Sequence, residues 1–373
     1  MRFDLTDDQE LMRDTARRFL EKEAPITATR KHYEAPQGFS QDVWRKACEI
    51  GWASLAASEE AGGYSLSGKM GQDLAVVAEE IGRLIGPGYF LPVAVSLQAL
   101  AQSEALLGEW APDLLAGEAI LAWAFGEPGN RWEPAAFKVE AVRSGEDIRL
   151  NGVKAYVEGG ASAKAFVVTA RSEGGLTQLL VAADHPGVMV VPARCVDFSR
   201  RFAEVRFEDA RLPAAAVLGA FAGADAAVER QLQLALLLQC AETNGALEQA
   251  FAFTIDYMRQ RYAFGRPIAS YQALKHRLAD MLLWLHSCMA TTDAALDAYD
   301  AGSPDAPRLA RIAKAYVATK SVHMMGELVQ MTGGIAVTWE HDLHLYERRV
   351  AVNRAMLGAP EQHRFSLRQL IPA

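Results

Sequence analysis

The chain of 373 residues contains little cysteine, and none of it is spaced for metal binding or disulfide exchange. The four cysteines are Cys48, Cys195, Cys240 and Cys288, and no two of them form a CxxC pair. Zinc sites and thioredoxin-like redox motifs need such close spacing, so neither is predicted and no metal is expected. Scattered thiols in a chain of this size are typical of a reducing compartment, and we therefore expect a cytoplasmic protein.

Long apolar runs and an excess of positive charge are also missing. The first ten residues, MRFDLTDDQE, are charged and contain no apolar signal core, and no apolar run approaches the length of a bilayer span. Lysine and arginine total 38 against 46 aspartates and glutamates, which gives a formal net charge of −8. Because a phosphate backbone requires a basic face, we expect no nucleic-acid partner. Because no apolar run is long enough to span a bilayer, we expect no membrane partner.

What the chain does contain is ample apolar material, since 50% of its residues are hydrophobic. Its length predicts two or three structural units. The first third is helical in pattern: a helix is predicted from an N-cap at Thr6 to Pro25, and others over roughly Gln41–Ile50 and Gly71–Ile85. A loop rich in glycine and serine separates the last two.

The middle third consists of short strand-like runs separated by turn signals. Asn151–Gly152 lies between apolar segments and is a strong hairpin signal. Further turns are predicted at Ser144–Gly145, Gly174–Gly175 and Pro186–Gly187. We therefore predict an antiparallel β domain over residues 119–222.

The last third returns to helical spacing. A long first helix contains Asn244–Gly245, where a kink is expected, a second helix follows Pro267, and a third covers residues 310–331. The predicted fold class is α+β, with an N-terminal α domain over residues 1–118, the β domain over 119–222 and a C-terminal α domain over 223–373.

Two segments in the last third combine glycine with residues that can bind a cofactor. In the first, Arg261 and Phe264 precede Gly265, and an arginine beside a glycine can bind phosphate while the backbone approaches closely. In the second, a helix containing Gln330 ends at a double glycine. Taken alone, each segment is explained better by an ordinary helix end.

Together these segments resemble a known family. RYAFGRPIASYQALKHRLADM and QMTGGIAVTWEHDLHLYERR resemble, in the same order, the two C-terminal signatures of acyl-CoA dehydrogenases. LAWAFGEPGN and LNGVKAYVEGGASAKAFVVTAR resemble the family's two flavin-facing strands, and GWASLAASEEAGG resembles an N-terminal loop. The resemblance implies the acyl-CoA dehydrogenase fold: an N-terminal helical domain, a central antiparallel β domain and a C-terminal helical bundle. It also implies FAD as cofactor, an acyl-CoA thioester as substrate and an electron-transferring flavoprotein as electron acceptor.

The resemblance also implies roles for individual residues. In the family, the arginine and phenylalanine of the first motif and the glutamine that follows them contact the ADP half of the FAD held by a neighbouring subunit. The glutamine and the two glycines of the second motif contact the same half of the cofactor. Here these residues are Arg261, Phe264 and Gln272 in the first motif, and Gln330, Gly333 and Gly334 in the second.

The half of the site that faces the flavin ring departs from the family pattern. Gly126 stands where the family's TEPxAGSD stretch has threonine, and the serine–aspartate end of that stretch is missing. Glu158 stands where the family's W-I-T strand has a hydroxyl. An acid facing the flavin would disfavour the negative charge that the flavin gains on reduction. The alternative is that Glu158 points into solvent, because strand side chains alternate faces.

The family's catalytic base, which removes the α-proton of the acyl-CoA, is missing from both positions where members of the family place it. Leu357 occupies the position before Gly358 near the C-terminus, and Ala235 occupies the position on the helix before the RYAFG motif. The nearest spare acid on that helix is Glu242, about two turns beyond Ala235, or roughly 10 Å along the axis. Glu242 is therefore the first candidate for a displaced base, and Glu347, which lies in the other region but far upstream of Leu357, is the weaker one.

Three hypotheses follow from this pattern. The first is a subunit of a heteromeric acyl-CoA dehydrogenase, similar to bacterial steroid side-chain enzymes, in which a homologous subunit supplies the base within a heterotetramer. The second is a self-sufficient homotetramer with a displaced base, Glu242. The third is a non-enzymatic homologue that binds acyl-CoA or acts as a scaffold.

Overall fold

The computed structural model describes residues 5–31, 33 and 41–369, and these form two compact units. The helical unit contains the described residues up to Ala28, Gly71–Gly86 and those from Leu236 onward. The sheet unit contains the described residues of Thr29–Met70 and Pro87–Ala235. Each unit therefore combines stretches that are far apart in sequence. The predicted boundaries at residues 118 and 222 remain predictions.

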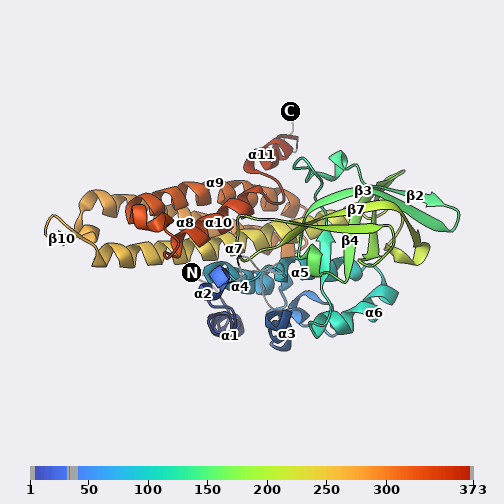
Figure 1. Ribbon diagram of the computed structural model, residues 1–373, viewed down its shortest axis with the longest axis horizontal. Coiled ribbons are helices and arrows are strands. Elements are labelled where there is room, and N and C mark those ends of the chain that lie inside the picture. The colour runs from blue at the N-terminus through green and yellow to red at the C-terminus, as the bar shows by residue number, and fades with distance from the viewer. Residues whose placement is uncertain (1–4, 32, 34–40, 370–373) are drawn as a thin grey trace. The chain divides into compact units, whose positions relative to one another are not determined.

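The first part of the chain is helical, as its spacing predicts (Figure 1). The helix expected from Thr6 is confirmed: Gln9 N donates to Thr6 Oγ1 and Thr6 N donates to Gln9 Oε1, both at 3.2 Å. This reciprocal pair satisfies two backbone donors that a helix N-terminus leaves open. The helices are α1 (Asp7–Glu23), α2 (Ile26–Lys31), α3 (Gln41–Glu49), α4 (Met70–Arg83), α5 (Phe90–Leu100) and α6 (Glu104–Leu115).

The sheet unit is built on one sheet of eight strands, in the order β6-β7-β3-β2-β4-β5-β8 with β1 paired to β4. The expected antiparallel sheet is corrected to a mixed one, because both β1 and β2 pair with β4 in parallel. Parallel neighbours are joined by long connections, which no local turn signal announces. The strands are β1 (Leu121–Ala124), β2 (Glu140–Ser144), β3 (Asp147–Glu158), β4 (Ala165–Ser172), β5 (Gly175–Ala182), β6 (Val188–Ala193), β7 (Phe202–Pro213) and β8 (Val217–Leu218).

The tight turns next to glycine are confirmed at two of the predicted positions. Ser144 pairs with Asp147 across the turn at Gly145, and Ser172 pairs with Gly175 across the turn at Gly174. These turns join β2 to β3 and β4 to β5, which places buried apolar residues of all four strands in one core.

The hairpin predicted at Asn151–Gly152 is wrong, because β3 continues through both residues. The pairing of β3 with β7 shifts register between Leu150 and Gly152, and Gly152 has a φ of +126°. Asn151 Oδ1 accepts a hydrogen bond from Asp209 N at 2.8 Å across this irregularity. The asparagine and glycine therefore form a β-bulge, which uses the same turn chemistry as a hairpin.

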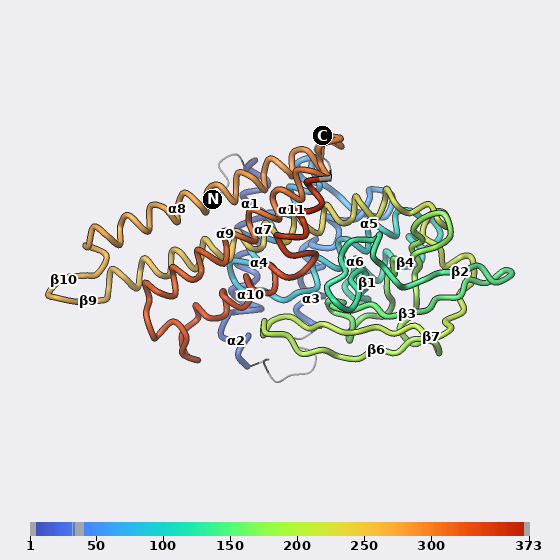
Figure 2. The backbone as a smooth tube through the Cα atoms, turned by 90° about the horizontal axis from the view of Figure 1, so that it is seen from above, coloured from blue at the N-terminus to red at the C-terminus, as the bar shows by residue number. Residues whose placement is uncertain are grey.

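The helical unit is dominated by long helices, and Figures 1 and 2 show α7, α8 and α9 running side by side. No helix within the described residues is both long and apolar enough to cross a membrane. The elements of the last third are α7 (Asp225–Gln260), β9 (Tyr262–Ala263), β10 (Arg266–Pro267), α8 (Gln272–Asp300), α9 (Ala306–Thr332), α10 (Leu343–Ala355) and α11 (Pro360–Gln369).

Helix α7 passes through Asn244–Gly245 without interruption, and the glycine allows close packing, while the kink expected there remains a prediction. A Cβ at Gly245 would lie 1.9 Å from the carbonyl oxygen of Glu79 on α4. A Cβ at Gly82 of α4 would likewise lie 1.8 Å from the carbonyl oxygen of Glu242. The two glycines therefore allow the backbones of α4 and α7 to touch, which any larger residue would prevent.

We expect Gly245→Ala to lower the free energy of unfolding by more than about 2 kcal/mol, because the new methyl group would displace the backbone of α4. The matched control is Gly326→Ala in α9, where an added Cβ meets nothing within 4 Å. There the better helix propensity of alanine should stabilise the protein by about 1 kcal/mol. Urea denaturation of both variants measures the difference, and equal effects at the two positions would refute this account of α4–α7 packing.

Candidate functional site

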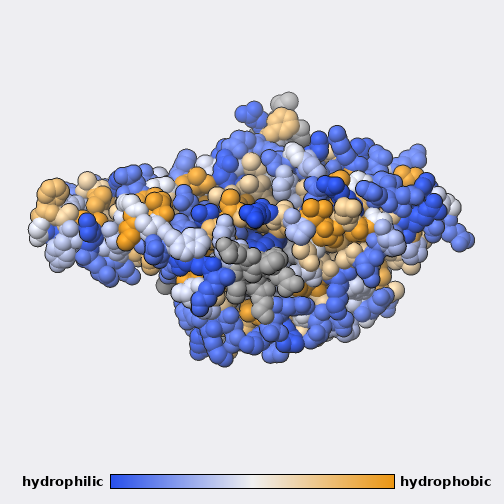
Figure 3. Space-filling model, viewed as in Figure 1, coloured by the Kyte–Doolittle hydropathy of each residue, from blue (hydrophilic) through white to orange (hydrophobic). Residues whose placement is uncertain are grey.

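The RYAFG motif forms an exposed hairpin after α7. Phe264 and Gly265 lie between β9 and β10, with φ values of +52° and +81°. Phe264 is 98% exposed, and apolar atoms gather at this end of the helical unit (Figure 3). A fully exposed aromatic ring on a left-handed residue is uncommon and gains nothing for the isolated unit. The hairpin therefore presents a contact surface.

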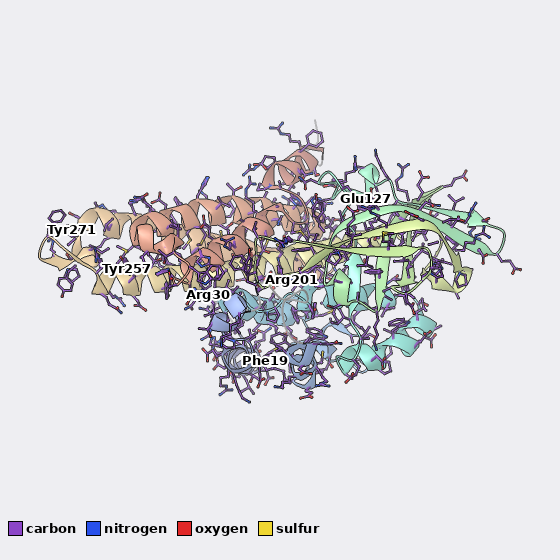
Figure 4. The ribbon with its side chains drawn as sticks, viewed as in Figure 1. Phe19, Arg30, Glu127, Arg201, Tyr257 and Tyr271 are labelled. Carbon is purple, nitrogen blue, oxygen red and sulfur yellow. The ribbon has the colours of Figure 1, made fainter. Side chains whose placement is uncertain are left out.

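Two further residues of the first motif surround this hairpin. Arg261 is exposed, and within the described residues its guanidinium makes no ion pair or hydrogen bond, whereas its backbone nitrogen donates to Tyr257 at 2.9 Å. Gln272 is exposed at the first position of α8, directly after Tyr271. Figure 4 labels Tyr257 and Tyr271 at this end of the bundle. The structure thus brings Arg261, Phe264 and Gln272 together around one hairpin.

The second motif lies at the end of α9. Gln330, Gly333 and Gly334 are all exposed, and Gly333 has a φ of +77° that terminates the helix. Arg277 on α8 donates through Nε to Glu327 on α9 at 2.7 Å, so the beginning of α8 and the end of α9 lie side by side. The two motifs therefore occupy the same end of the helical unit.

This end of the bundle fits the ADP half of a dinucleotide. An uncommitted guanidinium can form paired hydrogen bonds with a phosphate, and an exposed aromatic ring can stack on a base. An added Cβ at either Gly333 or Gly334 meets nothing within 4 Å, so their backbone is open to close approach. The roles of these residues in cofactor binding remain predictions. Such roles require exposed residues, and these residues are exposed in the structure.

Both positions of the family's catalytic base are buried and apolar. Ala235 on α7 is completely buried. Leu357 follows α10, is 4% exposed and has a φ of +60°, and its carbonyl oxygen accepts a hydrogen bond from His363 Nε2 at 3.0 Å. Neither position presents a group that can accept a proton from a substrate carbon.

The first candidate for a displaced base, Glu242, is buried in an ion pair with Arg349 of α10. Arg349 also donates through Nη2 to the carbonyl oxygen of Gly86 at 2.8 Å, and Asn353 donates to Glu242 Oε2 at 3.4 Å. The carboxylate is thus committed to Arg349 and Asn353 within the core of the helical unit. A general base instead requires an uncommitted carboxylate facing the substrate.

His363 on α11 contacts the segment where the C-terminal base would stand. Its Nε2 would lie 2.8 Å from a Cβ at Gly358, next to Leu357. Burial, together with the positive charges of Lys314 and Arg311, lowers the pKa of His363 to about 3. The imidazole is therefore neutral in the folded protein and donates a hydrogen bond to the backbone.

The buried histidine makes stability depend on pH. Its folded pKa of about 3 lies below the ordinary value of 6.5, so between these values only the unfolded chain binds the proton. Stability from this group is complete above pH 6.5 and falls as the pH drops, by about 1.4 kcal/mol per pH unit. We expect His363→Gln to lose less stability than the wild type between about pH 6.5 and 4.5 in urea denaturation. His323→Gln, an exposed control on α9, should follow the wild type, and parallel curves for all three would contradict the assignment.

The sheet unit contains a buried ion pair at the end of β1. Lys154 on β3 donates through Nζ to Glu127 Oε1 and to Phe125 O, each at 2.9 Å, and Figure 4 labels Glu127 there. Glu127 also accepts from the backbone nitrogens of Lys138 and Val139 at 2.6 and 3.0 Å. Burial lowers the pKa of Lys154 to about 8, although the charge of Glu127 opposes the shift. The pair fastens the loop after β1 to β3.

The alternative that Glu158 points into solvent is wrong. Glu158 is buried, and its Oε1 lies 2.8 Å from Nε of Arg200, which is also buried. Burying an acid is favourable only beside a positive charge, which Arg200 supplies. The sequence contained Arg200–Arg201 only as a short basic run, and nothing in the spacing links it to Glu158. Arg200 and Lys154 are the site residues that sequence reasoning missed.

Comparisons with known proteins agree with these features. The family model for the acyl-CoA dehydrogenase N-terminal domain matches residues 6–118, and that for the C-terminal domain matches residues 191–369. Acyl-CoA dehydrogenase IpdE2 of Mycobacterium tuberculosis is 30% identical, with 95% of each chain covered.

Two solved structures extend the comparison. A chain of the ChsE4–ChsE5 complex from Mycobacterium tuberculosis is 27% identical, covers all of both chains and has a TM-score of 0.87. A glutaryl-CoA dehydrogenase from Mycobacterium smegmatis in complex with FADH2 is 22% identical, covers 98% of this chain and 95% of that chain, and has a TM-score of 0.85. The second comparison shows the shared fold.

Proposed function

Because the chain belongs to the acyl-CoA dehydrogenase family, an FAD-dependent family, we propose that it is one of two unlike subunits of a heteromeric acyl-CoA dehydrogenase. In this proposal the homologous partner supplies the catalytic base and the pocket for the flavin ring. This chain contributes the residues that contact the ADP half of the partner's FAD.

One observation carries the proposal: the family's base is replaced and the nearest acid is committed elsewhere. Leu357 and Ala235 are buried and apolar, and Glu242 is paired with Arg349. A base that abstracts an α-proton needs an uncommitted carboxylate that faces the substrate, whereas Glu242 is held in a buried ion pair. The related chain in the ChsE4–ChsE5 complex, which contains two different components, supports a heteromeric arrangement.

In the proposed complex, FAD would accept the hydride that leaves the β-carbon of the acyl-CoA. The residues of this chain would act by binding. Arg261 would supply charge to the pyrophosphate, Phe264 an aromatic face, and Gly333 and Gly334 an open backbone. Gln272 and Gln330 would add hydrogen bonds at the same end of the bundle. Their shared exposure favours this role over one within the isolated unit.

The proposed substrate is an acyl-CoA thioester, as the family implies, and we propose a steroid side-chain thioester as the first substrate to test. The segment TWEHDLHLYERR resembles that branch of the family in sequence. Electrons would pass from the flavin to an electron-transferring flavoprotein. The cytoplasmic location remains a prediction from the distribution of cysteines.

Co-expression with a homologous subunit tests the heteromeric arrangement. We expect the two chains to purify together as a heterotetramer, with FAD bound and with acyl-CoA dehydrogenation that neither chain shows alone. Native mass spectrometry gives the composition, and flavin absorbance gives the FAD content per chain. A homotetramer of this chain that carries one FAD per subunit and turns over acyl-CoA would refute the proposal. Absence of flavin even with the partner would favour the non-enzymatic alternative.

Replacing Glu242 separates a structural role from a catalytic one. We expect Glu242→Gln to lower the free energy of unfolding by about 3–5 kcal/mol, because it leaves Arg349 buried without a counter-charge. The double variant Glu242→Gln/Arg349→Met should recover part of this loss and retain turnover in the complex. Thermal melts and single-turnover assays provide the measurements. If the folded double variant keeps its flavin but loses all turnover, Glu242 is the displaced base and the self-sufficient alternative gains support.

A further inference from the structure

Gly126 lies two residues beyond the end of β1, and the side chain of Trp132 packs directly over it. A Cβ at Gly126 would be 2.5 Å from Cζ3 of Trp132, so only glycine leaves room for the indole. Trp132 is 4% exposed, and its Nε1 has no hydrogen-bond partner within the described residues. A buried donor without a partner is unfavourable by about 1–3 kcal/mol, so packing and not polar contact keeps Trp132 in place.

A closed loop returns the chain to this position. Glu127 N donates to Arg131 O at 3.0 Å, and Arg131 N donates to Glu127 O at 3.3 Å. Between them, Gly129 and Asn130 both adopt left-handed conformations, with φ values of +82° and +57°. This tight turn places the residue that follows it, Trp132, back over the start of the loop.

The residues beneath and beside Trp132 are fixed to β3. Ala155 N donates to Gly126 O at 2.9 Å, and Lys154 Nζ donates to the carbonyl oxygen of the residue before Gly126 at 2.9 Å. Tyr156 has a φ of +59° where β3 is bulged, and its ring centroid lies 5.3 Å from that of Trp132 at an interplanar angle of 30°. The two rings therefore pack on each other above Gly126.

The buried acid of the same strand is fixed in place as well. A Cβ at Gly88 would lie 2.1 Å from Glu158 Oε1, so the carboxylate packs directly against the backbone of Gly88. Arg200 neutralises it. The position where the family has a flavin-bonding hydroxyl is thus filled by a buried ion pair.

Gly126, Tyr156 and Glu158 lie on the two segments that resemble the family's flavin-facing strands, and the residues present do not fit an isoalloxazine ring there. We propose that Trp132 and Tyr156 close this chain's own flavin-ring site from within. A chain that had lost only its base could still bind a flavin ring in its own site. The inference that this site is filled therefore goes beyond the proposed function, on which it rests. It restricts this chain to the ADP end of its partner's FAD.

The probe for this inference is lumiflavin, which is the flavin ring system without the ADP arm. The wild-type chain should show no saturable binding of lumiflavin in equilibrium dialysis. Trp132→Ser should bind it at least about tenfold more tightly than the wild type, because the indole no longer covers Gly126. Trp123→Phe is the matched control. Trp123 is also buried with an unpaired Nε1 within the described residues, but it stacks on Phe125, so its removal should not create binding.

A second measurement needs no ligand. Gly126→Thr should lower the melting temperature of the wild type, because its Cβ overlaps Trp132, and should lower it less when Trp132→Ser is present. Saturable lumiflavin binding by the wild type overturns the inference. So does a folded Trp132→Ser variant that gains no binding, or an equal loss from Gly126→Thr in both backgrounds. If Trp132→Ser does not melt cooperatively, Trp132→Leu replaces it in both experiments. Saturable lumiflavin binding by the wild type overturns the inference whichever variant is used.

The outcomes distinguish this inference from the proposed function. A wild-type chain that binds lumiflavin but does not dehydrogenate acyl-CoA alone would overturn the closed ring site and leave the heteromeric proposal intact. A wild-type chain that binds no lumiflavin, but forms a homotetramer active on acyl-CoA, would overturn the proposed function and the inference together.

Discussion

The helical unit depends on one buried carboxylate whose charge is balanced within its core. Glu242 of α7 is paired with Arg349 of α10, and Arg349 in turn donates to the carbonyl oxygen of Gly86 after α4. Removing two charges from water is unfavourable by several kcal/mol per ion, so neither group can leave the pair without a large loss of stability. The acid nearest to a family base position is therefore needed to connect three elements of the fold, and this requirement is incompatible with proton transfer.

In the sheet unit, too, the buried acids Glu127 and Glu158 are each paired with a basic side chain. Glu127 is paired with Lys154 and also accepts two backbone hydrogen bonds, while Glu158 is paired with Arg200. Each pair lies beside a segment that resembles a flavin-facing strand, and each fixes local backbone geometry. Both charges are therefore balanced by a basic side chain of the same unit. Charge balance within each unit and the missing base are thus both consistent with the proposed division of roles between two subunits.

Much of the fold could be predicted because helices and tight turns depend on neighbouring residues. The N-cap at Thr6 is such a local signal. Asn151–Gly152 shows the limit of this reasoning, since the same backbone preference suits a hairpin and a bulge, and the choice is made by pairing with a distant strand. The motifs at the end of the bundle could be predicted from resemblance. The partners of Glu158 and Glu242 could not, because each lies far along the chain and no periodicity connects them.

The residues around Leu357, as well as its apolar side chain, are unsuited to a catalytic base. Leu357 has a left-handed backbone, and its carbonyl oxygen accepts a hydrogen bond from His363. Lys314 donates to the carbonyl oxygen of Asn353 nearby and, with Arg311, already depresses the pKa of His363. The same positive charges would lower the pKa of a carboxylate placed at position 357, whereas a base for an α-proton needs a raised one. A single acidic substitution would therefore restore the residue type without restoring the electrostatic environment, which is the reason for proposing that a second chain supplies the base.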